Sequence, residues 1–317
     1  MSNLSLFDEP LSFDRDRLRR KLTELAERGV FIGTSSWKYE GWLEQIYTTS
    51  RYLSRGRFSQ RQFQETCLAE YAETFPIVCG DFSFYQFPAP DYWRKLFTSA
   101  PKTLRYALKV PEEITAKAFP KHERYGPRAG EKNASFLDAA VFNAMFLDAL
   151  RPYREQVAVL IFEFGAFPRY CYQHVTEFIA ELEPFLARLP DDFRYAVEIR
   201  NPEFLGPEYF QCLHQNGVAH VLNAWSRMPE LQVQMQLPEV FTADFTVVRA
   251  LLRRGRPYEQ AVAQFSPYKQ VQEVNEPARE SMRAVIRRAA DRNQPAYIFV
   301  NNRLEGNAPQ TIEAIVT

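Results

Sequence analysis

Long apolar stretches, paired cysteines and net charge are all missing from this sequence of 317 residues. No run of about 18 apolar residues occurs, which excludes an ordinary membrane-spanning helix. The four cysteines are widely spaced and form no C-x-x-C pair, so neither a zinc ribbon nor a disulfide scaffold is expected. Lys plus Arg and Asp plus Glu both number 39, so the global positive charge of a nucleic-acid binder is absent. Any anion site must therefore be local.

Several motifs of known chemistry are also missing. The chain has no G-x-S-x-G elbow, and we interpret Cys79 as a small core residue rather than an activated thiol. Its four histidines form no cluster at the end of any expected strand, so we expect no metal site built on imidazole. The N-terminus lacks the apolar stretch of a signal peptide, and we expect a soluble cytoplasmic protein with reduced thiols.

What is present is a repeated alternation of short β-rich runs and longer amphipathic stretches. We expect strands at 30–36, 76–82, 103–110, 157–164, 193–199, 218–224, 245–251 and 296–302. Helical patterns are clearest at 59–74, 133–150, 172–188 and 277–290. Eight such repeats predict an α/β fold, a TIM-type (β/α)8 barrel, because parallel strands need crossover helices. A doubly wound open sheet would usually begin with a Gly-rich turn, and none is present.

The chain is expected to divide unevenly. Leu18, Leu22 and Leu25 recur at helical spacing and Gly29 follows them, which predicts an N-terminal helical extension over residues 1–29. Residues 30–317 then form a single barrel domain. Long strand-to-helix segments at 37–58, 111–132, 225–244 and 252–274 all fall on the C-terminal face, where barrel enzymes place their active sites. This face is where we expect the functional site.

Strand alternation then selects residues at the barrel mouth. In the fifth expected strand Val197 and Ile199 can face the helices, which leaves Glu198 and Arg200 on the inner side. Two interpretations stay open, a structural ion pair that closes the barrel top and a pair that faces a ligand. Other strands end in polar residues of the same kind, namely Asp81, Lys109, Glu163, Arg249, Asn301 and Asn302.

These side chains suggest an anion site and an acid–base pair. Lys109, Arg200 and Arg249 together could surround an anionic group. Glu163 and Glu198 lie on neighbouring strands, about 5 Å apart by strand spacing, so that one could have a raised pKa and act as a general acid. The same pair could instead only balance Arg200. Mg²⁺ on the carboxylates is a weaker alternative, because it would compete with the nearby cations.

Aromatic residues follow the same strands. Trp37, Tyr39 and Tyr85 are candidate walls for a substrate, although packing of the long loops explains such rings equally well. The run from Arg253 to Arg256 follows the seventh strand, and we interpret it as a solvated basic loop rather than a phosphate site.

Seven stretches of the chain together resemble one known family. They are GTSSWKYEGW at 33–42, YAETFPIVCGDFSFYQFP at 71–88, YALKVPEEIT at 106–115, LIFEFGAF at 160–167, YAVEIRNPEF at 195–204, VVRAL at 247–251 and FVNNRLEGNAP at 299–309. The chain is similar in these stretches to the domain of unknown function 72 family, also called YecE-like proteins. The resemblance implies a TIM-type barrel and gives no reaction.

The resemblance also marks mouth positions, and this chain departs from the family pattern at several others. The matching positions are Thr34, Ser35, Trp37, Tyr39, Phe84, Tyr85, Lys109, Glu198, Arg200, Arg249 and Asn302. Cys79 and Asp81 stand where family members usually have Glu and Asn, and Asn201 stands where they have His. Chemistry that depends on those positions is therefore altered or lost in this divergent member, or Glu163 supplies a new acid.

Three functions are consistent with these observations. The first is an enzyme, a hydrolase or lyase, that acts on a small anionic substrate such as a sugar phosphate or a nucleotide. Its catalytic residues would be Glu198, Glu163 and Asp81, and its substrate-binding residues Trp37, Tyr39, Tyr85, Lys109, Arg200, Arg249, Asn301 and Asn302. The second is a nucleic-acid-binding protein that uses the aromatic residues that follow the strands and the basic loop from Arg253 to Arg256. The third is a barrel without catalysis. We expect no cofactor and no membrane partner, and the sequence predicts no oligomeric state.

Overall fold

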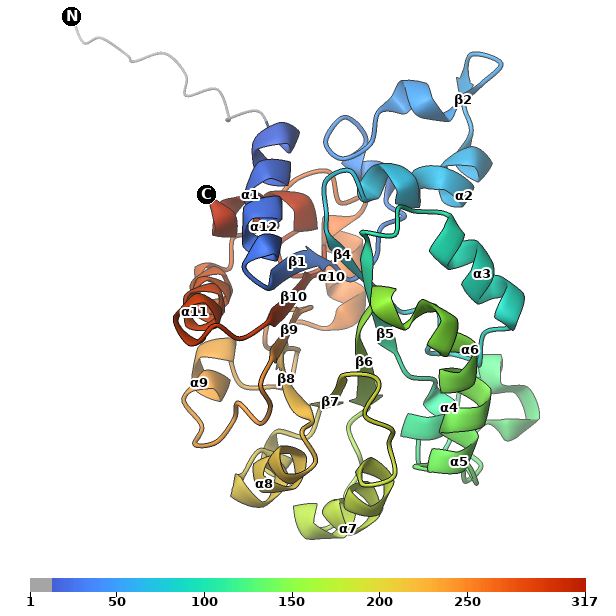
Figure 1. Ribbon diagram of the computed structural model, residues 1–317, viewed down its shortest axis with the longest axis vertical. Helices are drawn as coiled ribbons and strands as arrows, with labels where there is room; N and C mark the ends of the chain where they lie inside the picture. The colour runs from blue at the N-terminus through green and yellow to red at the C-terminus, as the bar shows by residue number, and fades with distance from the viewer. Residues whose placement is uncertain (1–12) are drawn as a thin grey trace, which may run out of the picture.

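The strands form a closed parallel barrel in the computed structural model, which describes residues 13–317 (Figure 1). Around the barrel the order is β1-β10-β9-β8-β7-β6-β5-β4. The strands are β1 (Val30–Thr34), β4 (Ile77–Gly80), β5 (Arg105–Lys109), β6 (Val157–Phe164), β7 (Tyr195–Ile199), β8 (Ala219–Ala224), β9 (Thr246–Ala250) and β10 (Ala296–Val300). All eight expected strands are present, and the predicted TIM-type (β/α)8 fold is confirmed.

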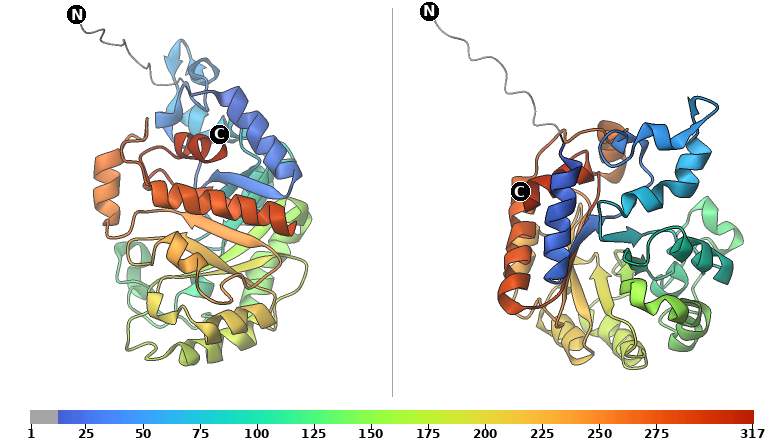
Figure 2. Two further views of the ribbon diagram at one scale, coloured as in Figure 1. Left: turned by 90° about the vertical axis from the view of Figure 1, so that its left-hand side faces the viewer. Right: turned by 45° about the horizontal axis from the view of Figure 1, so that its top comes forward.

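Helices surround the barrel on its outer side (Figure 2). The α-helices are α1 (Arg15–Glu27), α2 (Gln60–Tyr71), α3 (Pro90–Thr98), α4 (Glu112–Thr115), α5 (Ala139–Phe142), α6 (Asp148–Leu150), α7 (Val175–Leu186), α8 (Pro207–Gln215), α9 (Leu231–Met235), α10 (Tyr258–Phe265), α11 (Glu276–Arg292) and α12 (Ala308–Val316). Shorter turns are η1 (Glu40–Trp42), η2 (Thr49–Tyr52), η3 (Glu123–Arg128), η4 (Asn143–Leu147), η5 (Arg151–Gln156) and η6 (Pro202–Phe204). Among the described residues no helix is both long and apolar enough to cross a membrane.

The prediction of one continuous helix over 133–150 is wrong in where the helix starts and in its continuity. The pattern over 133–150 forms α5, a π-helical turn η4 and α6, and it begins only at Ala139. Asn133 explains the late start, because its side-chain amide donates to the carbonyls of Glu113 and Ala116 and holds the preceding segment as a loop. Asp138 then caps α5 by accepting from the amide of Ala140.

The helix α1 lies where the N-terminal pattern predicts a helix. Asp14 caps it by accepting from the amide of Arg17 at 2.8 Å. Leu18 and Leu22 are fully buried, and α1 packs on β1 and α12. Of the predicted extension, residues 1–12 lie outside the described part of the chain. The division into 1–29 and 30–317 stays a prediction.

Side-chain alternation separates two apolar layers. Positions that face the helices, such as Val197 and Ile199, belong to the large outer core. A second cluster fills the inside of the barrel with residues such as Ile161, Val221, Val247 and Phe299. Because apolar residues close the barrel interior below, polar groups that follow on the same inward positions can gather only at the C-terminal mouth.

Candidate active site

Each of the eight strands carries a polar residue at its C-terminal end. This residue stands either at the last inward position within the strand or at the first position after the strand ends. These residues are Ser35, Asp81, Lys109, Glu163, Glu198, Asn223, Arg249 and Asn301. Register supports the placement, since Glu163 pairs directly with Glu198 across β6 and β7, and Asn223 pairs with Arg249 across β8 and β9. The geometric prediction that charged side chains from separate strands meet at one mouth is therefore met.

The three expected cations surround an anion, and that anion is the side chain of Glu163. The Nζ of Lys109 lies 2.9 Å from a Glu163 oxygen, Arg200 lies 3.0 Å from the other oxygen, and Arg249 donates to Glu163 at 2.5 Å. The pocket for a foreign anion that we expected between these three residues is thus occupied by a carboxylate of the chain itself.

Two further carboxylates complete a network of three cations and three anions. Glu198 accepts from Arg249 and lies 3.1 Å from Arg200. Asp81 lies 3.4 Å from Arg249 and 3.6 Å from Lys109. The formal charges cancel, which satisfies the requirement that buried charges be paired. Glu198 and Arg249 are almost completely buried, whereas the side chain of Asp81 is 41% exposed, so only the outer part of the network can meet a substrate.

The electrostatics of Glu163 contradict the expectation that it serves as an acid with a raised pKa. Burial alone would raise the pKa of this carboxyl, but the charges of Arg200, Lys109 and Arg249 outweigh burial and hold the pKa far below its usual range. Burial would lower the pKa of Lys109, and Glu163 and Asp81 instead raise it. Glu163 is therefore ionised and Lys109 is charged at neutral pH.

The carboxylates fit a metal ion poorly. Asp81, Glu163 and Glu198 were the candidates for Mg²⁺, and each one contacts at least two basic side chains. No group of three His, Cys, Asp or Glu side chains suited to a metal ion occurs within residues 13–317. The cations occupy the oxygen positions that a metal ion would need.

Aromatic rings support the network from outside, although they are not the rings that we named as walls. Lys109 lies 3.6 Å above the ring of Phe84, and Arg200 lies 3.8 Å above the ring of Trp225. Of the named walls, Trp37 is buried edge-on against Phe82. Sequence reasoning could not rank these rings because all of them follow strands.

The two remaining named walls, Tyr39 and Tyr85, contact different residues. Tyr39 packs against Trp42 and Tyr268, and Tyr85 is half exposed beneath the guanidinium of Arg124. Their role as substrate walls stays a prediction.

The asparagines after β10 hold the backbone. The Oδ1 of Asn301 accepts from the amide of Arg303, and the Oδ1 of Asn302 accepts from the indole of Trp42 and the amide of Ala308. Asn223 was missed, although its inward phase on the sixth expected strand would have found it. Its Oδ1 is buried and has no hydrogen-bond partner within the described residues.

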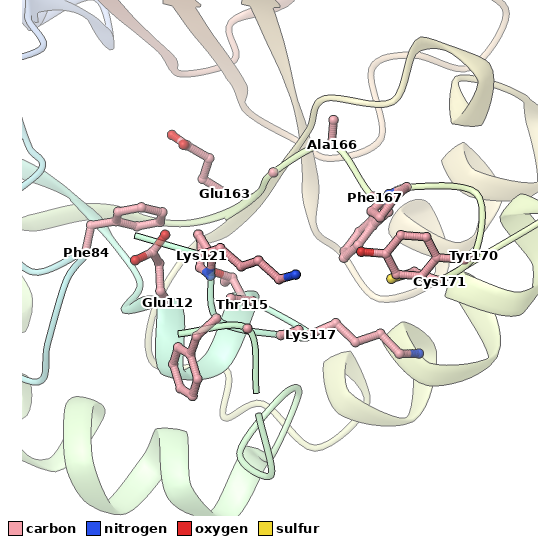
Figure 3. A pocket seen from close by; sticks show the side chains of 17 residues that line it. Phe84, Glu112, Thr115, Lys117, Lys121, Glu163, Ala166, Phe167, Tyr170 and Cys171 are labelled. Carbon is pink, nitrogen blue, oxygen red and sulfur yellow. The ribbon is translucent and has the colours of Figure 1, made fainter. Parts of the chain in front are cut away.

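A cavity of about 540 Å³ opens beside the network (Figure 3). It lies between the segments that follow β5 and β6, and Glu163 is the network residue that lines it. Phe84 and Glu112 lie beside Glu163 at one end, and Phe167, Tyr170 and Cys171 lie at the other. Its walls are thus aromatic and its inner end carries two carboxyl groups, which is typical of small-molecule sites.

Glu112 is a candidate that sequence reasoning missed. It begins α4 in the long segment after β5, it is 9% exposed, and its carboxyl accepts from the hydroxyl of Tyr125. Burial raises the pKa of Glu112 in spite of that hydrogen bond and the charges of Arg124 and Lys109. Its position in a segment already selected as a long mouth loop was the available signal.

Two of the three arginines in the basic loop after β9 share one carboxylate. Arg253 and Arg256 both bind Glu273, Arg256 at 2.5 Å. Glu273 therefore compensates their charge only in part, and Arg254 is exposed. A role of this loop in binding nucleic acid or phosphate stays untested.

Comparisons with known proteins agree with the fold. The curated protein "UPF0759 protein YecE" of Escherichia coli K12 is 25% identical over 205 residues, a stretch that covers 61% of this chain and 58% of that protein. The chain thus matches less than two thirds of that relative's length. A crystal structure of a DUF72 family protein from Enterococcus faecalis V583 superposes with a TM-score of 0.60 at 15% identity and covers 90% of this chain and 95% of its own.

A second solved structure and a family model extend this agreement. A DUF72 family protein from Thermotoga maritima MSB8 superposes with a TM-score of 0.57 at 18% identity and covers 90% of this chain and 97% of its own. The model described as "Protein of unknown function DUF72" matches residues 31–317, all of the barrel except Val30. Together with the closed barrel and its polar mouth, this match shows that the chain belongs to the DUF72 family.

Proposed function

We propose that the protein is a hydrolase that acts on a small anionic sugar derivative in the cavity beside the mouth network. The observation that carries the proposal is the pair of carboxyl groups at the inner end of that cavity. Glu112 has a pKa raised by burial, and Glu163 has a pKa lowered by three cations. Two carboxyl groups whose environments push their pKa values apart are the usual basis for assigning a general acid and its ionised partner.

The two groups would have different roles in one step. In its protonated form, Glu112 gives its proton to the leaving oxygen as the bond to that oxygen breaks, and it takes up a proton from solvent before the next turnover. Glu163, ionised, accepts a hydrogen bond from the attacking water, whose hydroxyl adds to the carbon while its proton passes to solvent. Glu198, fully buried, acts here as a positioning residue that holds Arg200 and Arg249 around Glu163.

The lining of the cavity supports the substrate class. Phe84, Phe119, Phe167 and Tyr170 line it with rings that suit the apolar faces of a sugar. Lys121 lines it as well, and it forms no ion pair within residues 13–317, so its charge favours an anionic substrate.

A barrel without catalysis is the alternative that one observation favours. The mouth network is electrically neutral and internally paired, as a purely structural network would be.

Turnover measurements distinguish the proposed hydrolase from a barrel without catalysis. We expect the wild-type chain to hydrolyse a member of a panel of hexose phosphates, uronic-acid glycosides and nucleotides, and Glu112→Gln to lower that rate by about 10²–10⁴-fold. Glu113→Gln is the matched control, because Glu113 is the next residue, also has a pKa raised by burial and does not line the cavity. A wild-type chain that hydrolyses nothing in the panel, or a Glu112→Gln variant as fast as Glu113→Gln, contradicts the proposal.

A further inference from the structure

A second cationic site lies on the other side of the mouth. Arg303 follows β10, and β10 and β6 occupy opposite positions in the eight-stranded barrel. The amide of Arg303 donates to the side chain of Asn301 at 3.0 Å, which fixes the turn that carries it. This site is therefore separate from the cavity beside Glu163.

Arg303 differs from the cations of the mouth network in its partners. Lys109, Arg200 and Arg249 each contact carboxylates, whereas Arg303 forms no ion pair with any residue from 13 to 317. Its Nε is buried and has no hydrogen-bond partner among those residues. Its guanidinium lies 4.5 Å above the ring of Tyr258, a contact that orients the group without neutralising it.

Two further tyrosines, Tyr39 and Tyr268, lie close enough to this guanidinium for its charge to act on their phenols, and Tyr268 is hydrogen-bonded to it. The rings of Tyr39 and Tyr268 meet edge to face at 5.4 Å, and they come from the segments after β1 and β9. Burial raises the pKa of both phenols, although the charge of Arg303 opposes it. Both hydroxyls therefore keep their protons at neutral pH and remain hydrogen-bond donors.

We propose that Arg303, Tyr39 and Tyr268 form a binding site for a phosphoryl group. The paired N–H groups of a guanidinium satisfy both oxygens of a carboxylate. A phosphoryl group has at least one further oxygen, which phenol hydroxyls can bind. A partly buried charge that has no ion pair within residues 13–317, and whose buried Nε lacks a partner there, is the feature that such an anion would complete. The site goes beyond the proposed hydrolysis, since neither Glu112 nor Glu163 takes part in it.

Isothermal titration with inorganic phosphate at low ionic strength tests the proposal. We expect the wild-type chain to bind phosphate and Arg303→Gln to weaken binding by at least about tenfold, as loss of a charged hydrogen-bonding group should. Arg254→Gln is the matched control, because Arg254 is an exposed arginine on a neighbouring loop. Glu112→Gln should bind phosphate as the wild type does, which separates this site from the proposed active site.

Thermal melting checks that each variant is folded. If Arg303→Gln does not fold, Arg303→Lys carries the test, and it should bind several-fold more weakly because lysine keeps the charge and loses the fork. No phosphate binding by the wild type at millimolar concentration overturns the proposal. Equal binding by the folded Arg303 variant and Arg254→Gln overturns it too.

Discussion

Arg249 is the residue on which the mouth network depends most. It donates to Glu163 and Glu198 and lies 3.4 Å from Asp81, so it joins β9 to three other strands. It is among the largest fully enclosed side chains of the protein. Burying such a charge is unfavourable in isolation, and the three carboxylates compensate it. Removing it would leave two buried carboxylates with fewer partners than they need.

We therefore expect Arg249→Met to lower the free energy of unfolding at pH 7 by about 3–5 kcal/mol, the usual cost of breaking a buried ion pair. Urea denaturation of the wild type and the variant measures the loss. Arg254→Met, at an exposed arginine, should change stability by less than about 0.5 kcal/mol. An Arg249→Met chain as stable as Arg254→Met would show that the network contributes nothing.

Strands, helices and the faces of their side chains were predictable from the sequence wherever a pattern of neighbouring residues determines them. The inward phase of Glu198 and Arg200 follows from Val197 and Ile199 alone, because side chains of a strand alternate between its faces. The start of the helix at Ala139 was not predictable, because a hydrogen-bonded loop at Asn133 competes with the helical pattern.

Ion pairing and cavities depend on contacts between elements, which a local pattern does not contain. The sequence indicated which charges reach the mouth, but not that Lys109, Arg200 and Arg249 would enclose Glu163. Glu112 was missed for the same reason, since its burial depends on how the segments after β5 and β6 pack together.

The strand β8 carries a pH-dependent contribution to stability at His220. Its ring packs against Tyr209 and Phe210 of α8, and burial lowers its pKa to about 3. The unfolded chain binds this proton near pH 6.5. The stability from neutral His220 is thus complete above about pH 6.5 and is lost as the pH falls toward 3.

Replacing the histidine should flatten this dependence. We expect the free energy of unfolding to fall less for His220→Phe than for the wild type between pH 6.5 and pH 4.5. The slopes of this free energy against pH should differ by up to about 1.4 kcal/mol per pH unit. Urea denaturation at both pH values measures the slopes, and His122→Phe, in an exposed segment, should keep the wild-type slope. Identical slopes for His220→Phe and the wild type would argue that His220 is not buried as neutral imidazole.

At the scale of the whole molecule, the barrel closes through a short contact. The strands β1 and β4 share a single registered pair, Thr34 with Val78. A Cβ atom on Gly33 would lie 1.9 Å from the carbonyl oxygen of Ile77, so only glycine permits the approach. This closure brings Asp81 of the β4 end within reach of Arg249 and completes the network.

The closed barrel gathers opposed electrostatic environments at one cavity. Folding places Glu112 in a buried position that favours its neutral form and Glu163 among three cations that favour its charged form. A group such as Glu112, with a raised pKa, contributes stability below its unfolded pKa and loses that contribution as the pH rises. Glu163 contributes above its unfolded pKa and loses that contribution only in acid.

A carboxyl ¹³C NMR titration of glutamate-labelled protein tests this opposition most directly. The Glu112→Gln and Glu163→Gln variants assign the two signals, and Glu113→Gln identifies the neighbouring one. We predict that the Glu112 signal titrates above the ordinary glutamate pKa of about 4.3, and that the Glu163 signal remains that of a carboxylate well below it. Titration of both signals together near the ordinary value would contradict the account.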